Sequence, residues 1–223
     1  AKYDAADSLY RRSVDIDRKI YGVESPGVAQ SYNNLGTLHG RQGHHAQADS
    51  FLSAALRIRR AMHGENHPKL AESLNNLARL NIEIGAYAEA QPLLERALAL
   101  DTQKYGPSHP YVGGDRLNLG RVAWKRGQIR RAEEQLEEAA RIFQASLPAG
   151  HPRTAEPLVV WGRMLAENSR LEEAADRLRR GLTLRRRAFD DEHWRVGVVQ
   201  SLLGHVRAEQ RQYAAAETLQ VAG

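Results

Sequence analysis

With 223 residues, of which 42% are hydrophobic and 26% charged, the chain suits one or two globular domains or an array of repeats. It has no cysteine, which excludes disulfides, zinc sites with thiolate ligands and a cysteine nucleophile. No apolar run reaches the roughly 20 residues that span a bilayer, and the first ten residues lack a signal-peptide core. We therefore expect a cytoplasmic protein without a membrane partner.

The net charge of +5 arises in the second half of the chain. Residues 1–115 carry 13 Lys and Arg against 13 Asp and Glu, whereas residues 116–223 carry 19 against 14. Any preference for an anionic partner should therefore lie in the C-terminal half.

In chain order, the sequence repeats itself with a period of 42 residues. Self-similarity of this kind is the signature of a stacked array, so we expect one solenoid domain over residues 1–223. It consists of a half repeat at 1–25, complete repeats at 26–67, 68–109, 110–151 and 152–193, and a partial repeat at 194–223. Because the chain starts with Ala1, we expect it to be a piece of a longer protein.

Each complete repeat should contain two helices. Proline suits the first position of a helix, where its missing N–H would have no partner, and the residue before it is then the N-cap. The first helices should begin at Pro26, Pro68, Pro110, Pro152 and, in the fifth place, Trp194. Their N-caps would be Ser25, a good cap, and the poorer caps His67, His109 and His151. With a further helix at about 2–20, the chain has about eleven helices.

Further positions of the repeat also keep their character. One is always alanine: Ala6, Ala48, Ala90, Ala132, Ala174 and Ala216. A second is small, which would let the two helices of a pair approach closely: Gly36, Ala78, Gly120, Gly162 and Gly204. The residue before it is large and apolar, and we expect burial of Leu35, Leu77, Leu119 and Leu203. A third marks the turn between the helices: Gly43, Gly85 and Gly127, and later Ser169 and Arg211.

The pattern Leu-Gly/Ala, Gly-x-Tyr-x-x-Ala and Ala-Leu resembles the tetratricopeptide repeat, most closely in residues 31–58 and 73–100. The 42-residue period and the motif "HP…LNNLA" resemble in particular the repeats of kinesin light chains. The resemblance implies an all-α, right-handed superhelical solenoid of antiparallel helix pairs. Its first helices would line a concave groove that binds an extended peptide or a partner protein.

The three His-Pro histidines are the obvious candidates for a metal or an acid–base site. Neighbouring repeats would stack about 10 Å apart, too far for ligands that must lie within roughly 2.1 Å of one ion. We therefore interpret these histidines as helix starts. The sequence also contains no Gly-rich phosphate loop, His-Glu-x-x-His or Gly-x-Ser-x-Gly. We expect no metal, no cofactor and no enzymatic activity.

The resemblance places two ladders of polar side chains in the groove. Asn34, Asn76 and Asn118 match the second Asn of the kinesin-light-chain-like motif, which contacts bound peptide, and an amide can both donate to and accept from a peptide backbone. Arg79, Arg121 and Arg163 would suit carboxylate or phosphate. Lys125 follows Arg121 without an acid at helical spacing, Gly114 leaves room nearby, and Val160 and Leu202 make the groove apolar further on.

A second interpretation is open for both ladders. The Asn side chains could bond neighbouring helices, and the Arg side chains could pair with a Glu four residues later, as Arg79 with Glu83 and Arg163 with Glu167.

The function we expect is a scaffold for protein interaction whose ligand, a protein or peptide, could be acidic. One alternative is a regulatory region of a larger signalling enzyme. Another is a solenoid that binds RNA or anions, which the groove residues Glu72, Glu83, Glu156 and Glu167 and the lack of an aromatic ladder disfavour. Because both ends break a repeat, apolar faces near Leu9 and Leu219 should associate end to end with other copies.

Overall fold

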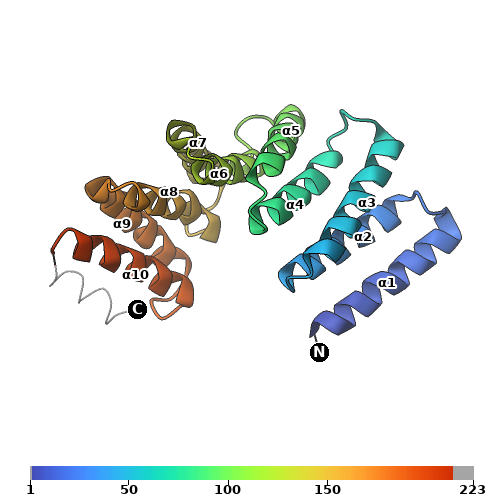
Figure 1. Ribbon diagram of the computed structural model, residues 1–223, viewed down its shortest axis with the longest axis horizontal. Coiled ribbons are helices and arrows are strands. Elements are labelled where there is room, and N and C mark those ends of the chain that lie inside the picture. Colours follow the sequence, from blue (N-terminus) through green and yellow to red (C-terminus); the bar gives the residue numbers. More distant parts are fainter. Residues whose placement is uncertain (1, 213–223) are drawn as a thin grey trace. The chain divides into compact units, whose positions relative to one another are not determined.

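The computed structural model describes residues 2–212, in which every regular element is a helix and no strand occurs. The chain divides into two compact units, residues 1–107 and 108–223, and each is described by itself. Figure 1 labels the helices. Unit 1 contains α1 (Lys2–Tyr21), α2 (Pro26–Arg41), α3 (His45–His63), α4 (Leu70–Glu83) and α5 (Tyr87–Tyr105). Unit 2 contains α6 (Pro110–Lys125), α7 (Ile129–Ser146), the 3₁₀ helix η1 (Pro152–Ala155), α8 (Glu156–Glu167), α9 (Leu171–Ala188) and α10 (Trp194–Glu209).

The all-α architecture of helix pairs confirms the predicted fold class. The described part has ten α-helices where about eleven were expected. The remaining helix was expected after Arg211, and Ala216 and Leu219 with it lie outside the described residues. Within each unit, successive helices pack against one another as pairs joined by short turns, α2 with α3 and α4 with α5 in unit 1 and α6 with α7 and α8 with α9 in unit 2 (Figure 1).

Three of the five first helices begin where the proline register predicts, and α4 and α8 begin later. Pro26, Pro110 and Trp194 are the first residues of α2, α6 and α10, and Pro152 opens η1, which leads into α8. Pro68 instead lies in a turn, and α4 begins two residues later at Leu70. None of these prolines lies in the interior of a helix.

The histidines before these starts are better caps than expected. In each case the imidazole Nδ1 accepts a hydrogen bond from the backbone N–H two residues later. The distances are 3.2 Å for His67, His109 and His151 and 3.1 Å for His193. Nδ1 is as many bonds from the backbone as the Oδ1 of asparagine, a strong cap, so it reaches the same orphan donors. This corrects the ranking of histidine as a poor cap here and gives all four histidines a structural role.

The small position allows the close packing that the sequence predicted. A Cβ added to Gly36, Gly120 or Gly162 would lie 2.5, 2.8 or 2.6 Å from the Cγ of a leucine on the second helix of the pair. Those leucines are Leu52, Leu136 and Leu178. All three are fully buried, so the second helix places a core leucine directly over the glycine.

The core follows the predicted register in most places. Leu35, Leu119 and Leu203 are buried as expected, and so are the four alanines Ala48, Ala90, Ala132 and Ala174. Leu77 differs because it is only partly buried, although it packs against apolar clusters formed by α3, α4 and α5.

On α1, Leu9 is 67% exposed and Ile16 48% exposed. Ile58, Leu100 and Ile142, which occupy the position of Ile16 in later repeats, are only 1% exposed. The half repeat therefore presents an apolar face that the complete repeats bury.

The turns between paired helices need a left-handed backbone, as the glycines suggested. Gly43, Gly85 and Gly127 have φ values of 76°, 79° and 73°, and Ser169 and Arg211 adopt 60° at the same position. Non-glycine residues are strained in this region, so the last two turns keep the conformation of the repeat at an energetic cost.

Candidate functional site

The candidate site lies on the first helices of the repeats, where the structure places every residue of the two predicted ladders. In unit 1, α2 carries Asn34 and α4 carries Asn76 and Arg79. In unit 2, α6 carries Asn118, Arg121 and Lys125, and α8 carries Val160 and Arg163. All of these side chains are partly buried or exposed.

In unit 1 the amide ladder is tied to a buried polar network. Asn76 donates from Nδ2 to Oδ1 of Asn33 on the neighbouring first helix at 3.0 Å. Asn33 in turn donates to Glu72 at 3.2 Å. Glu72 pairs with the buried guanidinium of Arg59 at 2.7 Å, and Arg59 also donates to the hydroxyl of Ser73. For Asn76, the interpretation as a bond between helices is thus the one that the structure shows.

The sequence interpretation missed Asn33 and Arg59. In the sequence, the only indications of these two residues were that Asn33 is the first residue of the Asn-Asn pair and that Arg59 is an arginine on a second helix.

The arginine of unit 1 also bonds to a neighbouring repeat. Arg79 donates to the hydroxyl of Thr37, one repeat period earlier, at 3.4 Å. Asn34 accepts a hydrogen bond from Gln30 at 3.3 Å, one helical turn before it. The pairing of Arg79 with Glu83 that helical spacing suggested is not among the ion pairs of the described chain. Hydrogen bonds within unit 1 therefore use much of the bonding capacity of the polar side chains on this face.

In unit 2, Lys125 is not the isolated cation that helical spacing suggested. Its Nζ lies 3.6 Å from the carboxylate of Glu167 on α8. The same Nζ lies 3.8 Å from the centroid of the Trp124 ring, and the Arg163 guanidinium lies 5.9 Å from that centroid. Glu167 therefore pairs with Lys125 and not, as expected, with Arg163. The Trp124 ring, which sequence analysis overlooked, is a further part of the site.

Arg121 occupies a more enclosed place on the same face. Its NH1 donates to Oδ1 of Asn118 at 3.4 Å, a long bond to a neutral partner. Burial lowers the pKa of the Arg121 guanidinium, Glu156 raises it, and the positive charges of Arg153 and Arg163 lower it further. The charges that act on Arg121 thus come from the next repeat.

Gly114 does not leave the room that we expected. A Cβ at Gly114 would meet the Arg153 guanidinium at 2.6 Å, so this side chain already fills the space over α6. The glycine accommodates a neighbouring arginine of the same unit.

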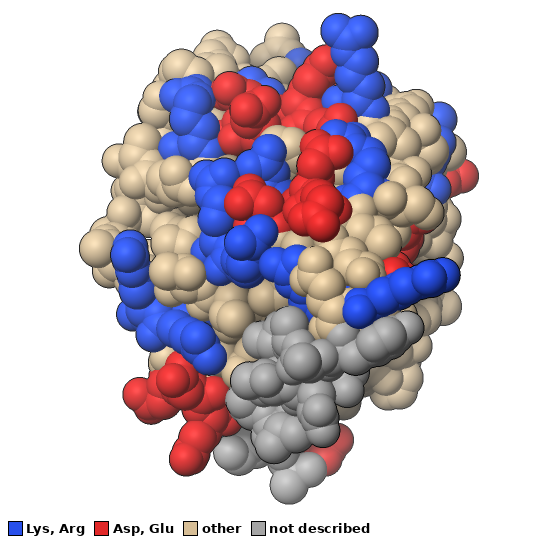
Figure 2. Space-filling view, turned by 90° about the vertical axis from the view of Figure 1, so that its left-hand side faces the viewer, with Lys and Arg blue, Asp and Glu red and all other residues tan. Residues whose placement is uncertain are grey.

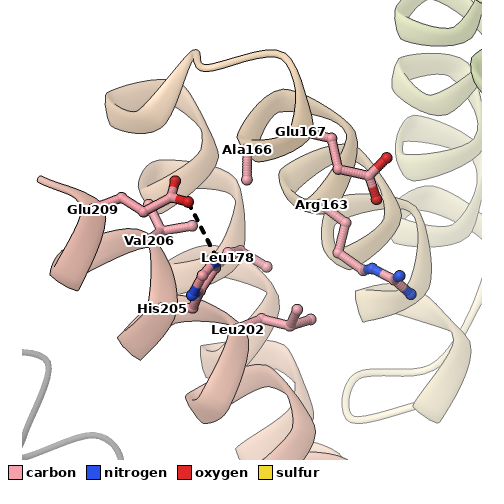
Figure 3. A pocket seen from close by; sticks show the side chains of 8 residues that line it. All are labelled: Arg163, Ala166, Glu167, Leu178, Leu202, His205, Val206 and Glu209. Carbon is pink, nitrogen blue, oxygen red and sulfur yellow. Dashed lines mark ion pairs between the residues drawn. The ribbon is translucent and has the colours of Figure 1, made fainter.

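An apolar pocket of about 270 Å³ lies between α8 and α10. Figure 3 shows Leu178 and Leu202 together in its interior, with Arg163 and Glu167 on one side and a His205–Glu209 pair, 3.2 Å apart, on the other. Ala166 and Val206 complete the lining. Leu202 thus contributes the apolar surface predicted for it, whereas Val160 is partly buried and packs against the core of unit 2. A pocket of this size could hold one apolar side chain of a ligand.

Among residues 2–212, no group of three His, Cys, Asp or Glu side chains is placed to hold a metal ion. In that same part of the chain, no helix is long and apolar enough to cross a membrane. His109 and His151 bond the starts of α6 and η1, and His67 bonds the turn before α4.

Sequence profiles of the tetratricopeptide repeat match residues 1–61, 47–103, 83–145 and 162–195. No curated protein sequence matches the chain significantly.

Solved structures share the fold over nearly the whole chain. BtubC (BKLC) from P. vanneervenii is 20% identical with a TM-score of 0.82, covering 98% of this chain and 88% of that one. A putative kinesin light chain with nearly identical TPR-like repeats from Podosopora anserina is 23% identical with a TM-score of 0.73, covering 86% and 92%. A Rap protein complexed with competence and sporulation factor is 14% identical with a TM-score of 0.74, covering 96% and 61%. The profile matches and the repeat geometry show that this chain belongs to the tetratricopeptide repeat family, whose members generally serve as scaffolds for protein interaction.

Proposed function

We propose that the chain binds an extended peptide segment of a partner protein along the first-helix face of unit 2. The observation that carries this proposal is the apolar pocket between α8 and α10 directly beside the cationic side chains of α6 and α8. Such a surface offers an anchor for one apolar side chain and polar groups for the neighbouring residues. Enzymatic activity is no part of the proposal.

The pocket would supply an apolar anchor for the peptide. Burying one leucine-sized side chain against Leu178, Leu202 and Val206 is worth about 1.5–3 kcal/mol. Arg163 on the rim would then fix the direction of the peptide by hydrogen bonding to its backbone or its polar side chains.

The polar residues of α6 would contact the peptide beyond the anchor. Asn118 accepts from Arg121 with its Oδ1, so its amide nitrogen is the group that it offers to a peptide carbonyl. Arg121 and Lys125 favour an acidic side chain or terminal carboxylate, and each charge-assisted hydrogen bond contributes roughly 1.5–3 kcal/mol. Val160 would flank the backbone. In unit 1, Asn34, Asn76 and Arg79 form a second proposed contact surface.

A nucleic-acid ligand fits this surface less well. Glu156 and Glu167 lie among the cations of the same face, and Figure 2 shows acidic and basic side chains interleaved over the side of the molecule that it draws. A polyanion such as RNA is bound by a continuous basic surface with aromatic rings for stacking. The same peptide surface would serve equally well in a regulatory region of a larger signalling enzyme.

A peptide-display library tests the proposal. Selected peptides should be titrated by calorimetry against the wild type and three variants, with circular dichroism confirming that each is folded. Leu202→Asp, which places a charge in the pocket, and Arg121→Glu should each weaken binding at least about tenfold, the size of one lost contact. Arg41→Glu, an exposed charge on α2 of the other unit, should change it little. Selection of no binder, or full affinity in Leu202→Asp, would contradict the proposal.

We also propose that the apolar side of α1, with Leu9 and Ile16, associates with a second copy of the chain. Sedimentation of the wild type should then show concentration-dependent association that Leu9→Lys with Ile16→Lys abolishes. A wild type that is monomeric at all concentrations would refute this association and leave the peptide site untouched.

A further inference from the structure

Four arginines of unit 2 lie on the helices that adjoin the beginning of α8. We call Arg121, Arg153, Arg163 and Arg185 the arginine cluster; they belong to α6, η1, α8 and α9. The charge of Glu156 acts on both Arg121 and Arg185, and the charges of Arg153 and Arg163 act on Arg121. Within the described residues, no ion pair joins a member of the cluster to a carboxylate.

Neutral partners hold these guanidinium groups in place. Arg153 lies 4.6 Å from the centroid of the Phe143 ring and covers the backbone at Gly114. Arg121 donates to the amide oxygen of Asn118, and Arg185, only 8% exposed, donates to the carbonyl of Pro152 at 2.9 Å. The contacts fix the positions of the groups without neutralising their charge.

The equivalent positions in unit 1 carry an ion pair that is absent from unit 2. In unit 1, Arg59 pairs with Glu72 at 2.7 Å across neighbouring repeats. Glu156 occupies the place of Glu72 two repeats later, but Phe143 stands where Arg59 would be. Arg185 occupies the place of Arg59 three repeats later, but Val198 stands where its acid would be. Both replacements remove an ion pair, and the cluster keeps an excess positive charge that the equivalent network in unit 1 neutralises.

Partly buried like charges repel each other and favour a bound anion. We propose that the arginine cluster binds a phosphoryl group, carried by a phosphorylated side chain of the peptide ligand. A carboxylate would add one negative charge, whereas a phosphorylated side chain adds about −1.5 to −2 and three acceptor oxygens. Several guanidinium groups can donate to these oxygens in paired fashion. The arginine cluster alone supports the binding of a phosphoryl group. That a peptide carries this phosphoryl group rests on the proposed function.

Inorganic phosphate and acetate, titrated by calorimetry at equal ionic strength, test the site without any peptide. Phosphate should bind at least tenfold more tightly than acetate. Arg121→Gln should weaken phosphate binding at least tenfold, and Arg163→Gln, at an exposed position that tolerates the change, provides a second variant should the first not fold. Arg130→Gln on α7, whose side chain is 94% exposed, removes the same charge elsewhere in the unit and should have no effect. Equal binding of acetate and phosphate, or full phosphate affinity in a folded cluster variant, would overturn the site.

The peptide arm compares a library-selected peptide containing serine with its phosphoserine form. The phosphoserine form should bind at least tenfold more tightly to the wild type, and this preference should vanish in Arg121→Gln. Equal affinity of the two forms would overturn the assignment to a phosphopeptide. Because the unmodified peptide would still bind in that case, such a failure is distinct from failure of the proposed function.

Discussion

Lys125 and Glu167 lie 3.6 Å apart although they are one repeat period apart in the sequence. They occupy the same position on the first helices α6 and α8, and stacking of the repeats brings these positions together. Arg79 and Thr37 in unit 1 are related in the same way. On this face, a side chain can therefore have its partner in the adjacent repeat as well as one helical turn away.

This pairing predicts that Glu167→Gln increases affinity for acidic ligands. Without the carboxylate, the charge of Lys125 is no longer offset, so an acidic peptide should bind about two- to fivefold more tightly. Both side chains are partly exposed, and an ion pair of this kind contributes about 0–1 kcal/mol, so the thermal midpoint should hardly move. Calorimetry with an acidic peptide measures the first effect, and Glu172→Gln, an exposed position on α9, is the control. Weaker binding by Glu167→Gln would mean that Glu167 itself contacts the ligand.

The fold could be predicted from the sequence because the contacts within one helix pair recur in every repeat. A small residue at Gly36, Gly120 and Gly162 and a leucine sixteen residues later are both visible in the register, and the structure packs one against the other. The left-handed turn at Gly127 and Ser169 was visible for the same reason. These features depend on local geometry that every repeat shares.

The candidate site was less predictable because it depends on contacts between repeats, where the repeats differ. Asn76 has Asn33 as partner. Arg153 fills the space at Gly114, and Glu167 rather than a residue of α6 neutralises Lys125. Helical spacing cannot reveal such partners. A comparison of each position with the one a full period away would have suggested the pair of Lys125 with Glu167.

Ser169→Gly should stabilise the protein. Ser169 adopts φ 60° in the turn between α8 and α9, where the equivalent residue of the previous repeat is Gly127 at φ 73°. A left-handed conformation costs a non-glycine residue about 1–2 kcal/mol, while glycine adds about 0.5–1 kcal/mol of entropy to be lost on folding. The net gain should be up to about 1 kcal/mol in urea unfolding. Gly127→Ser should lose a similar amount, and a loss in both variants would show that the hydroxyl of Ser169 matters more than the strain.

Gly120→Ala should destabilise unit 2 through a steric clash. The added Cβ would lie 2.8 Å from Cγ of the fully buried Leu136, and overpacking of this kind costs about 1–3 kcal/mol. In a Leu136→Ala background the clash disappears, and the same substitution should become neutral or stabilising because alanine favours helix over glycine by about 1 kcal/mol.

Gly40→Ala on α2 is the matched control for that cycle. A Cβ there would find its nearest neighbour at 3.7 Å, which is ordinary contact. Urea unfolding of the double-mutant cycle and the control measures all four effects. A Gly120→Ala cost that stays the same without the Leu136 side chain would show that close helix packing is not its cause.

Stability should fall as the pH is lowered, in part through His63. Burial lowers the pKa of His63, and the charges of His67, Lys69 and Arg59 lower it further. The unfolded chain therefore binds a proton at His63 at a higher pH than the folded chain does. In that window the free energy of unfolding rises with pH, so stability is lost as the pH falls below about 6.5, the ordinary value for histidine, and levels off below the folded pKa.

Tyrosine stands at the equivalent positions Tyr21 and Tyr105, so His63→Tyr is compatible with the repeat. Thermal midpoints at about pH 7.5 and 5.5 should differ less in His63→Tyr than in wild type, whereas a substitution of the exposed His45 to asparagine should leave the difference unchanged. If His63→Tyr loses as much stability on acidification as the wild type, the proton that destabilises the fold binds elsewhere, and the stacked His63 and His67 rings, with centroids 4.4 Å apart, serve for packing alone.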